Sequence, residues 1–168
     1  MSEVKNLWGN INVPSASVPG YVNLMQEQAD LLESQTQGLL LGELFQSNKY
    51  GVSSYRFDIV APKLNDYRYT LFLVVAGFYS YPVFLYDRGQ YDGPTWENVE
   101  MPYDRQMKKD TKRVPLNVNP TQRKLLLPPT YYIEEDSQFE SSLAKILQSN
   151  STKEVIRILL EKSQSVFT

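Results

Sequence analysis

"SSYRFDIVAPKLNDYRYTLFLVV", residues 53–75, is the stretch that decides the fold. In its first half Tyr55, Phe57 and Ile59 alternate with Arg56 and Asp58, which is the period of two expected of a β-strand. "PKLND" at 62–66 has the composition of a turn, and the apolar run after it returns as a second strand. The stretch therefore predicts an antiparallel β-hairpin.

The length of the loop determines which side chains share a face of the hairpin. A five-residue loop places Ile59 opposite Tyr69, Phe57 opposite Leu71, and Tyr55 opposite Leu73, all on one apolar or aromatic face. The other face then carries Arg56, Asp58, Val60, Arg68, Thr70, Phe72 and Val74, with Arg68 within reach of Asp58. A slip of one residue would exchange these assignments.

The chain after the hairpin predicts a further strand in "YPVFLY", residues 81–86. On the same pairing, Val83 and Leu85 join the apolar face, and Phe84 and Tyr86 join the mixed one. Pro82 has no N–H to give to a ladder, so we expect this strand at an edge of the sheet.

Helical patterns stand at both ends of the chain. Pro19 suits a first helical turn, and apolar residues follow at helical spacing, which predicts a helix at 19–35. Gly38 would stop that helix, and "LLLGELFQ" at 39–46 is interpreted as a strand. Near the end, Ser137 with Glu140 and Ser151 with Glu154 have capping-box spacing, which predicts two amphipathic helices joined at "SNS", a helical hairpin.

The predicted fold class is α+β in a single domain spanning residues 1–168. It comprises an antiparallel β-meander of about four to five strands, with the N-terminal helix and the C-terminal helical hairpin packed on one face. Residues 1–17 are expected to be a loose lead-in, and residues 87–130 a long proline-rich loop region.

Composition excludes several kinds of chemistry. The chain of 168 residues has no cysteine and no histidine, so catalysis by cysteine or histidine and the usual zinc sites are ruled out. Its 17 basic residues against 19 acidic ones do not favour a generic nucleic-acid binder. The N-terminus lacks the layout of a signal peptide, and the uncharged run 69–86 contains a proline and is shorter than the roughly 20 residues of a membrane span. These features predict a cytoplasmic protein that does not cross a membrane.

Two loop segments carry concentrated charge. The first contains the carboxylates Asp87, Asp92, Glu97, Glu100 and Asp104, which form either a solvated acidic loop or a cation site, although their spacing matches no EF-hand. The second contains the basic residues Arg105, Lys108, Lys109, Lys112 and Arg113. It is either an ordinary loop or a contact for nucleic acid, and "DTK" at 110–112 has the Asp-x-Lys form of some metal-dependent nucleases.

The mixed face of the sheet gives the leading functional hypothesis, because aromatic residues and arginine are over-represented in protein interfaces. We expect a non-enzymatic protein-interaction module, such as an adaptor, chaperone-like or inhibitor-type protein, without cofactor or metal. The residues expected to bind another protein are Arg56, Arg68, Phe72, Phe84 and Tyr86. The partner is a different protein or a second copy in a homodimer. In the opposing interpretation a helix or the proline-rich loop covers this face, and the alternative function is nucleic-acid binding or nuclease activity through the basic loop 105–124.

The phrases "VAPKLNDYRYTLF", "YPV" and "STKEVIRILLEKS" resemble a group of small bacterial α+β proteins that have no known activity. The resemblance covers the middle strands and the last helix. It implies a bacterial, cytoplasmic, single-domain protein and brings no chemistry with it. At the level of element order alone, the chain is also similar to small secretion-chaperone-like domains, which is an analogy of fold.

Overall fold

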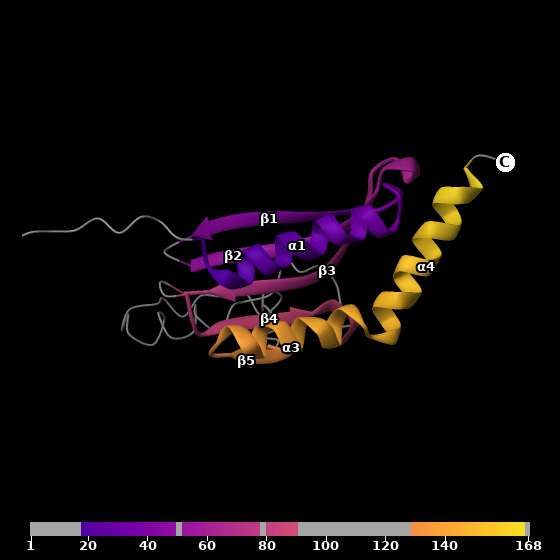
Figure 1. Ribbon diagram of the computed structural model, residues 1–168. Coiled ribbons are helices and arrows are strands. Elements are labelled where there is room, and N and C mark those ends of the chain that lie inside the picture. The colour runs from indigo at the N-terminus through magenta and orange to yellow at the C-terminus, as the bar shows by residue number, and fades with distance from the viewer. Residues whose placement is uncertain (1–17, 50–51, 78–79, 91–128, 167–168) are drawn as a thin grey trace, which may run out of the picture.

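The computed structural model describes residues 18–49, 52–77, 80–90 and 129–166 and shows an α+β fold (Figure 1). The strands are β1 (Leu41–Lys49), β2 (Val52–Ala61), β3 (Tyr67–Ala76), β4 (Val83–Asp87) and β5 (Tyr131–Ile133). The helices are α1 (Gly20–Gln35), α3 (Asp136–Leu147) and α4 (Asn150–Ser165), and η1 (Pro62–Leu64) and η2 (Arg88–Gln90) are short 3-10 turns. The strands form one antiparallel sheet in the order β1-β2-β3-β4-β5, so the predicted fold class is confirmed.

The hairpin predicted from residues 53–75 forms, but its register changes at a β-bulge. Ile59 pairs with Tyr69 as predicted, and Asp58 pairs with Thr70. Phe57 then pairs with Phe72, so the ladder passes over one residue of β3. The extra residue reverses the sidedness of the chain beyond it.

Three face assignments in β3 are consequently wrong. Phe72 and Val74 belong to the core under the helices, and Leu73 belongs to a separate cluster on the opposite face. Phe72, which the sequence placed on the mixed face, is fully buried and stacks on Phe57 with ring centroids 4.9 Å apart. No turn residue marks the bulge, because its extra residue is itself a leucine in an apolar run.

Strand β4 lies inside the sheet rather than at its edge. It pairs with β3 on one side and with β5 on the other, and β5 was not predicted. Pro82 precedes the first residue of β4, so its missing N–H costs the ladder nothing. Val83 and Leu85 face the helices, and Phe84 and Tyr86 face the other side, as expected. The edges of the described sheet are therefore β1, which has nine residues, and the three-residue β5.

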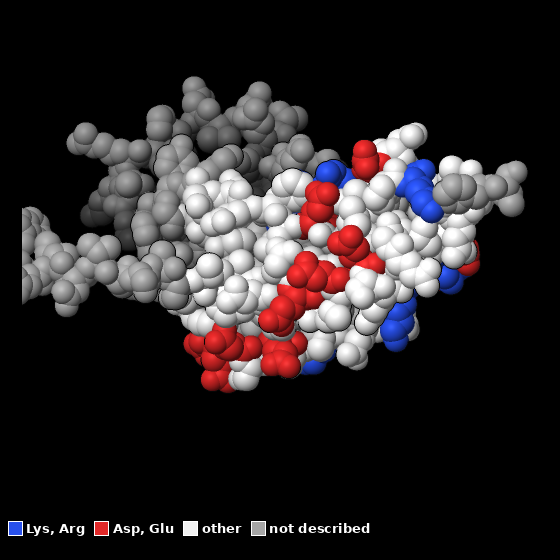
Figure 2. All heavy atoms as spheres, turned by 45° about the horizontal axis from the view of Figure 1, so that its top comes forward, with Lys and Arg blue, Asp and Glu red and all other residues white. Residues whose placement is uncertain are grey.

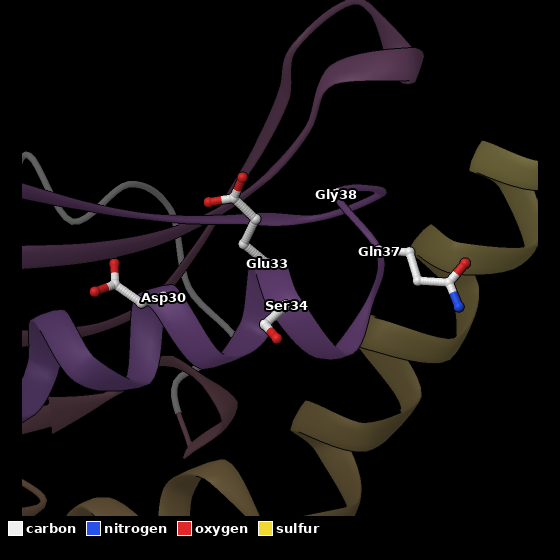
Figure 3. A pocket seen from close by; sticks show the side chains of 5 residues that line it. All are labelled: Asp30, Glu33, Ser34, Gln37 and Gly38. Atoms are coloured by element: carbon white, nitrogen blue, oxygen red, sulfur yellow. The ribbon is translucent and has the colours of Figure 1, made fainter.

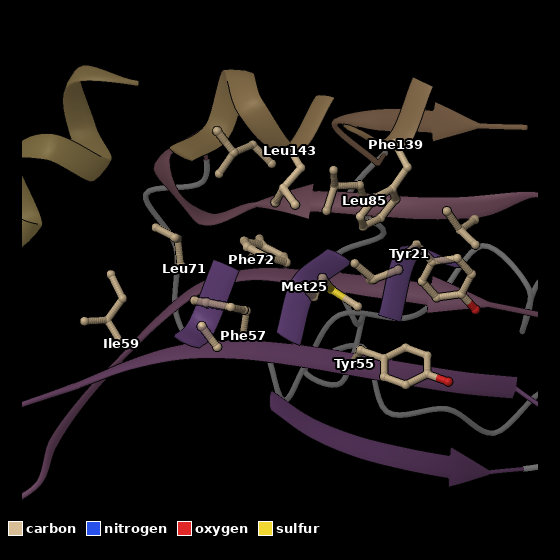
Figure 4. Packing of buried hydrophobic residues seen from close by; sticks show 14 of the residues in the cluster. Tyr21, Met25, Tyr55, Phe57, Ile59, Leu71, Phe72, Leu85, Phe139 and Leu143 are labelled. Carbon is tan, nitrogen blue, oxygen red and sulfur yellow. The ribbon is translucent and has the colours of Figure 1, made fainter. Parts of the chain in front are cut away.

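Helix α1 lies almost directly on β1. It ends where the predicted helix 19–35 ends and begins one residue later, and Tyr21, Met25 and Ala29 form its buried stripe. A Cβ at Gly42 of β1 would lie only 2.5 Å from the Cα of Ala29, so only glycine permits this approach. Figure 4 shows the core that results, with side chains of α1 and α3 set against the sheet. Each large apolar side chain buried there contributes about 1.5–3 kcal/mol of hydrophobic stabilisation.

The two predicted C-terminal helices are present, but they meet at a corner. Figure 1 shows α4 turning away from α3 instead of lying back along it. The cap of α4 is Ser149, whose Oγ accepts a hydrogen bond from the Thr152 amide at 3.2 Å, and not Ser151 as the capping-box spacing suggested. The Thr152 hydroxyl in turn donates to the Ile146 carbonyl at 2.8 Å and fixes the corner. Helix α3 begins one residue before Ser137, so that capping box does not form either.

Candidate functional site

The side of the sheet opposite α1 and α3, here called the second face, carries a compact group of charged and aromatic side chains on β1, β2 and β3. Phe45 of β1 pairs with Arg56 of β2. The guanidinium carbon of Arg56 lies 4.7 Å from the centroid of the Phe45 ring, and that of Arg68 lies 5.2 Å from it. Both distances are within the range of a cation–π interaction. We call Glu43, Phe45, Arg56, Asp58 and Arg68 the arginine–phenylalanine cluster.

Carboxylates hold both arginines of the cluster in place. Arg56 forms an ion pair with Asp58 at 3.0 Å, and the Thr70 hydroxyl donates to the same carboxylate at 2.8 Å. Arg68 donates to Glu43, and this hydrogen bond raises the pKa of the Arg68 guanidinium. The sequence had suggested Arg68 as the partner of Asp58, but Arg56, two residues away on the same strand, takes that place.

The residues of the cluster differ in how far they are exposed to solvent, and only the exposed ones can contact a partner. Asp58 is only 1% exposed, which is tolerable for a carboxylate because it is paired and hydrogen-bonded. The side chains of Arg56 and Arg68 are 44% and 43% exposed, and Phe45 is 40% exposed. The cluster therefore presents two fixed guanidinium groups beside an accessible aromatic ring.

The remaining residues predicted to bind a partner lie elsewhere. Phe84 is half-buried on β4, where its ring centroid is 5.4 Å from that of Tyr132 on β5. Tyr86 is fully buried in the small cluster with Leu73. Of the five predicted residues, only Arg56 and Arg68 thus belong to the arginine–phenylalanine cluster, whereas Phe84 packs against the small apolar cluster that contains Tyr86. The sequence analysis missed Phe45 because it assigned no faces to 39–46, although Leu44 and Phe45 at adjacent strand positions must point to opposite sides.

The two charged loop segments lie largely outside the described residues. All five residues of the predicted basic contact, 105 to 113, fall there, so the nucleic-acid hypothesis stays a prediction. Of the five acidic residues in the first loop, Asp87 alone lies in the described ranges: it is buried, and its Oδ1 accepts a hydrogen bond from the Gly89 amide at 2.9 Å. Burial raises the pKa of this carboxyl. Within the described ranges, no group of three or more carboxylates is arranged to hold a metal ion.

Acidic residues dominate the surface around α1. The helix contains Glu27, Asp30 and Glu33 and neither lysine nor arginine, and all three carboxylates are exposed. Figure 2 shows a band of acidic side chains across this side of the molecule with few basic ones among them. An open depression at the end of α1 is lined by Asp30, Glu33, Ser34, Gln37 and Gly38 (Figure 3). The side chains in it do not converge on one point, as a small-molecule site would require.

Comparison with known proteins adds no functional assignment. No protein-family model, curated protein or solved structure matches the sequence. The resemblance to small bacterial α+β proteins therefore stays a hypothesis. None of the helices in the described ranges is long and apolar enough to span a membrane.

Proposed function

We propose that this chain is a non-enzymatic protein-interaction module that binds another protein through the arginine–phenylalanine cluster. The observation that carries the proposal is the pair of arginines fixed beside an exposed aromatic ring. Arginine and large aromatic side chains dominate the binding energy of protein interfaces, and fixed side chains lose less conformational entropy when a partner binds.

The two arginines pair with carboxylates of different exposure, and this decides which arginine can be replaced without loss of the fold. Asp58 is buried and binds both Arg56 and Thr70, so Arg56 is part of the sheet's own polar network. Both side chains of the Arg68–Glu43 ion pair are partly exposed to solvent, so the pair contributes little to the stability of the fold. Arg68 and Phe45 are thus the positions where binding can be lost while the fold is kept.

The composition supports a binding role over catalysis and a reducing compartment over an oxidising one. Without cysteine or histidine, the chain lacks a thiolate nucleophile and the commonest general base, imidazole. The absence of cysteine also suits a reducing environment. We therefore place the module in the bacterial cytoplasm, as the resemblance also implies.

Photocrosslinking in the native host tests the proposal. A photoreactive phenylalanine at position 45 is expected to capture a discrete protein, and the same residue at Ile158 on α4, a comparably exposed position, is not. Arg68→Ala should abolish the capture at position 45 and leave the melting temperature within about 2 °C of the parent protein.

The photoreactive residue at Ile158 is one control, and an alanine variant on α4 is the other. Lys153→Ala removes an exposed cation from α4 and should leave the capture intact. Equal capture at 45 and 158, or capture that survives Arg68→Ala, would refute a role for the cluster.

A further inference from the structure

Strand β1 forms one edge of the sheet that the structure describes. Within the described residues, β1 pairs on one side only, with β2, over nine residues in unbroken register. Such an edge presents a row of backbone N–H and C=O groups that can pair with another chain. In the described structure β1 contains no proline and no bulge, two of the usual protections of an edge strand. Its charged residues are Glu43, which Arg68 engages on the second face, and Lys49 at its last position.

The two sides of this edge differ sharply in character. On one side α1 lies over β1, at the contact between Gly42 and Ala29. Figure 3 shows the carboxylates of Asp30 and Glu33 on the same side of α1, toward the open edge. On the other side of β1, Phe45 stands exposed among the arginines. An added strand would therefore meet carboxylates above it and an aromatic ring below it.

These surroundings specify the partner. Successive side chains of a strand point to opposite faces, so a strand added at β1 sends alternate residues toward α1 and toward Phe45. We propose that β1 binds an extended, basic segment of a partner protein as a sixth strand, with lysine or arginine facing Asp30 and Glu33 and apolar residues facing Phe45. This rests on the proposed function and adds to it the conformation and chemistry of the bound segment.

A second copy of the chain fits this edge less well. Antiparallel pairing of β1 with the β1 of another copy would bring the Asp30 and Glu33 side of one α1 toward the same side of the other. Because α1 has no basic residue to neutralise them, the facing carboxylates would repel each other. Charge thus favours a basic partner over self-association.

The test uses fluorescently labelled nine-residue peptides and the full chain. A peptide alternating lysine with valine should bind, and its counterpart with glutamate in place of lysine should not. A version of the lysine peptide with N-methyl groups on alternate residues keeps the charge but cannot complete the ladder, and it should bind at least about tenfold more weakly. Amide hydrogen exchange should slow in β1 of the complex.

Charge-reversal variants locate the site. Asp30→Lys with Glu33→Lys should weaken binding of the lysine peptide by about tenfold or more at low salt. Glu134→Lys with Glu140→Lys makes the same change in charge beside and on α3 and should alter binding less than twofold. Equal effects of the two pairs, equal binding of the N-methylated peptide, protection outside β1, or no binding of the lysine peptide would overturn the inference. If the capture at position 45 persists in any of these cases, the proposed function stands without the edge.

Discussion

Substitution of Gly42 by alanine should push α1 away from the sheet. A Cβ there would lie 2.5 Å from the Cα and 2.7 Å from the Cβ of Ala29, and 3.1 Å from the Phe57 ring. Ordinary contact begins near 3.4 Å, so in Gly42→Ala the helix must move by about 0.9 Å. A gap of that size forfeits a quarter to a half of each dispersion contact nearby, and overpacking of this kind costs about 1–3 kcal/mol.

We expect the free energy of unfolding of Gly42→Ala to fall by about 2–3 kcal/mol, near the upper end of that range because the obstacle is helix backbone. With a urea m-value of about 2 kcal/mol/M, the midpoint followed by circular dichroism should drop by about 1–1.5 M. Gly89→Ala is the matched control, since its Cβ would lie 2.6 Å from the Ser151 hydroxyl oxygen, which can rotate away. Its midpoint should move by less than about 0.3 M. Equal shifts in the two variants would mean that α1 does not lie on β1 as described.

Three further substitutions test local features of the fold. Gln37 lies two residues beyond the end of α1 and has φ at 54°. Gln37→Gly should stabilise the protein by about 0.5 kcal/mol in urea unfolding, because the relieved strain exceeds the added chain entropy, and Gln37→Ala should give no gain. Burial raises the pKa of Asp87, so its charge costs stability at neutral pH. That cost falls as the carboxyl is protonated and vanishes below about pH 3, where it is protonated in both the folded and the unfolded states. Asp87→Asn should therefore unfold at higher urea than the parent protein at pH 8 and at nearly the same urea at about pH 3; a difference that grows on acidification would contradict the assignment. The Ser163 hydroxyl is buried without a hydrogen-bond partner in the described structure, so Ser163→Ala should raise the melting temperature by about 2–4 °C, and a fall would show that the hydroxyl is satisfied.

Most of the fold could be predicted from the sequence, because the patterns that indicate its elements involve residues close together in the chain. The alternation around Phe57, the turn at 62–66 and the apolar stripe of α1 each depend on neighbouring residues, and each appears where the pattern places it. Strand β5 lacks such a signal, since three residues are too few for a period to show. The corner between α3 and α4 is held by hydrogen bonds of Thr152 with Ser149 and with the Ile146 carbonyl, whereas the capping-box spacing had pointed to Ser151 as the cap.

Only the arginines of the candidate site could be predicted from the sequence, because the β-bulge changes which residues of β3 face the same side. The extra residue of the bulge is in β3, so the alternation along β2 is unbroken and gives the side of Arg56. Arg68 lies next to the turn, so its side follows from the loop length. Every position of β3 beyond Leu71 depends on one inserted residue. Phe72 therefore went from predicted contact to core, and the exposed aromatic ring of the cluster comes from β1 instead.

This exchange of Phe72 for Phe45 changes what the cluster can do. An aromatic ring on β3 would have placed the contact surface in the middle of the sheet, where its backbone groups are already paired on both sides. Phe45 lies on the edge strand, so the arginines adjoin the side of β1 that pairs with no other strand of the described sheet. A partner that reaches the ring can also extend the ladder, gaining directional hydrogen bonds as well as buried apolar area. For this reason Phe45→Ser should weaken binding of the alternating lysine–valine peptide as well as capture in the host. If it changed neither, the aromatic ring and the strand edge would have to be separate features of the surface.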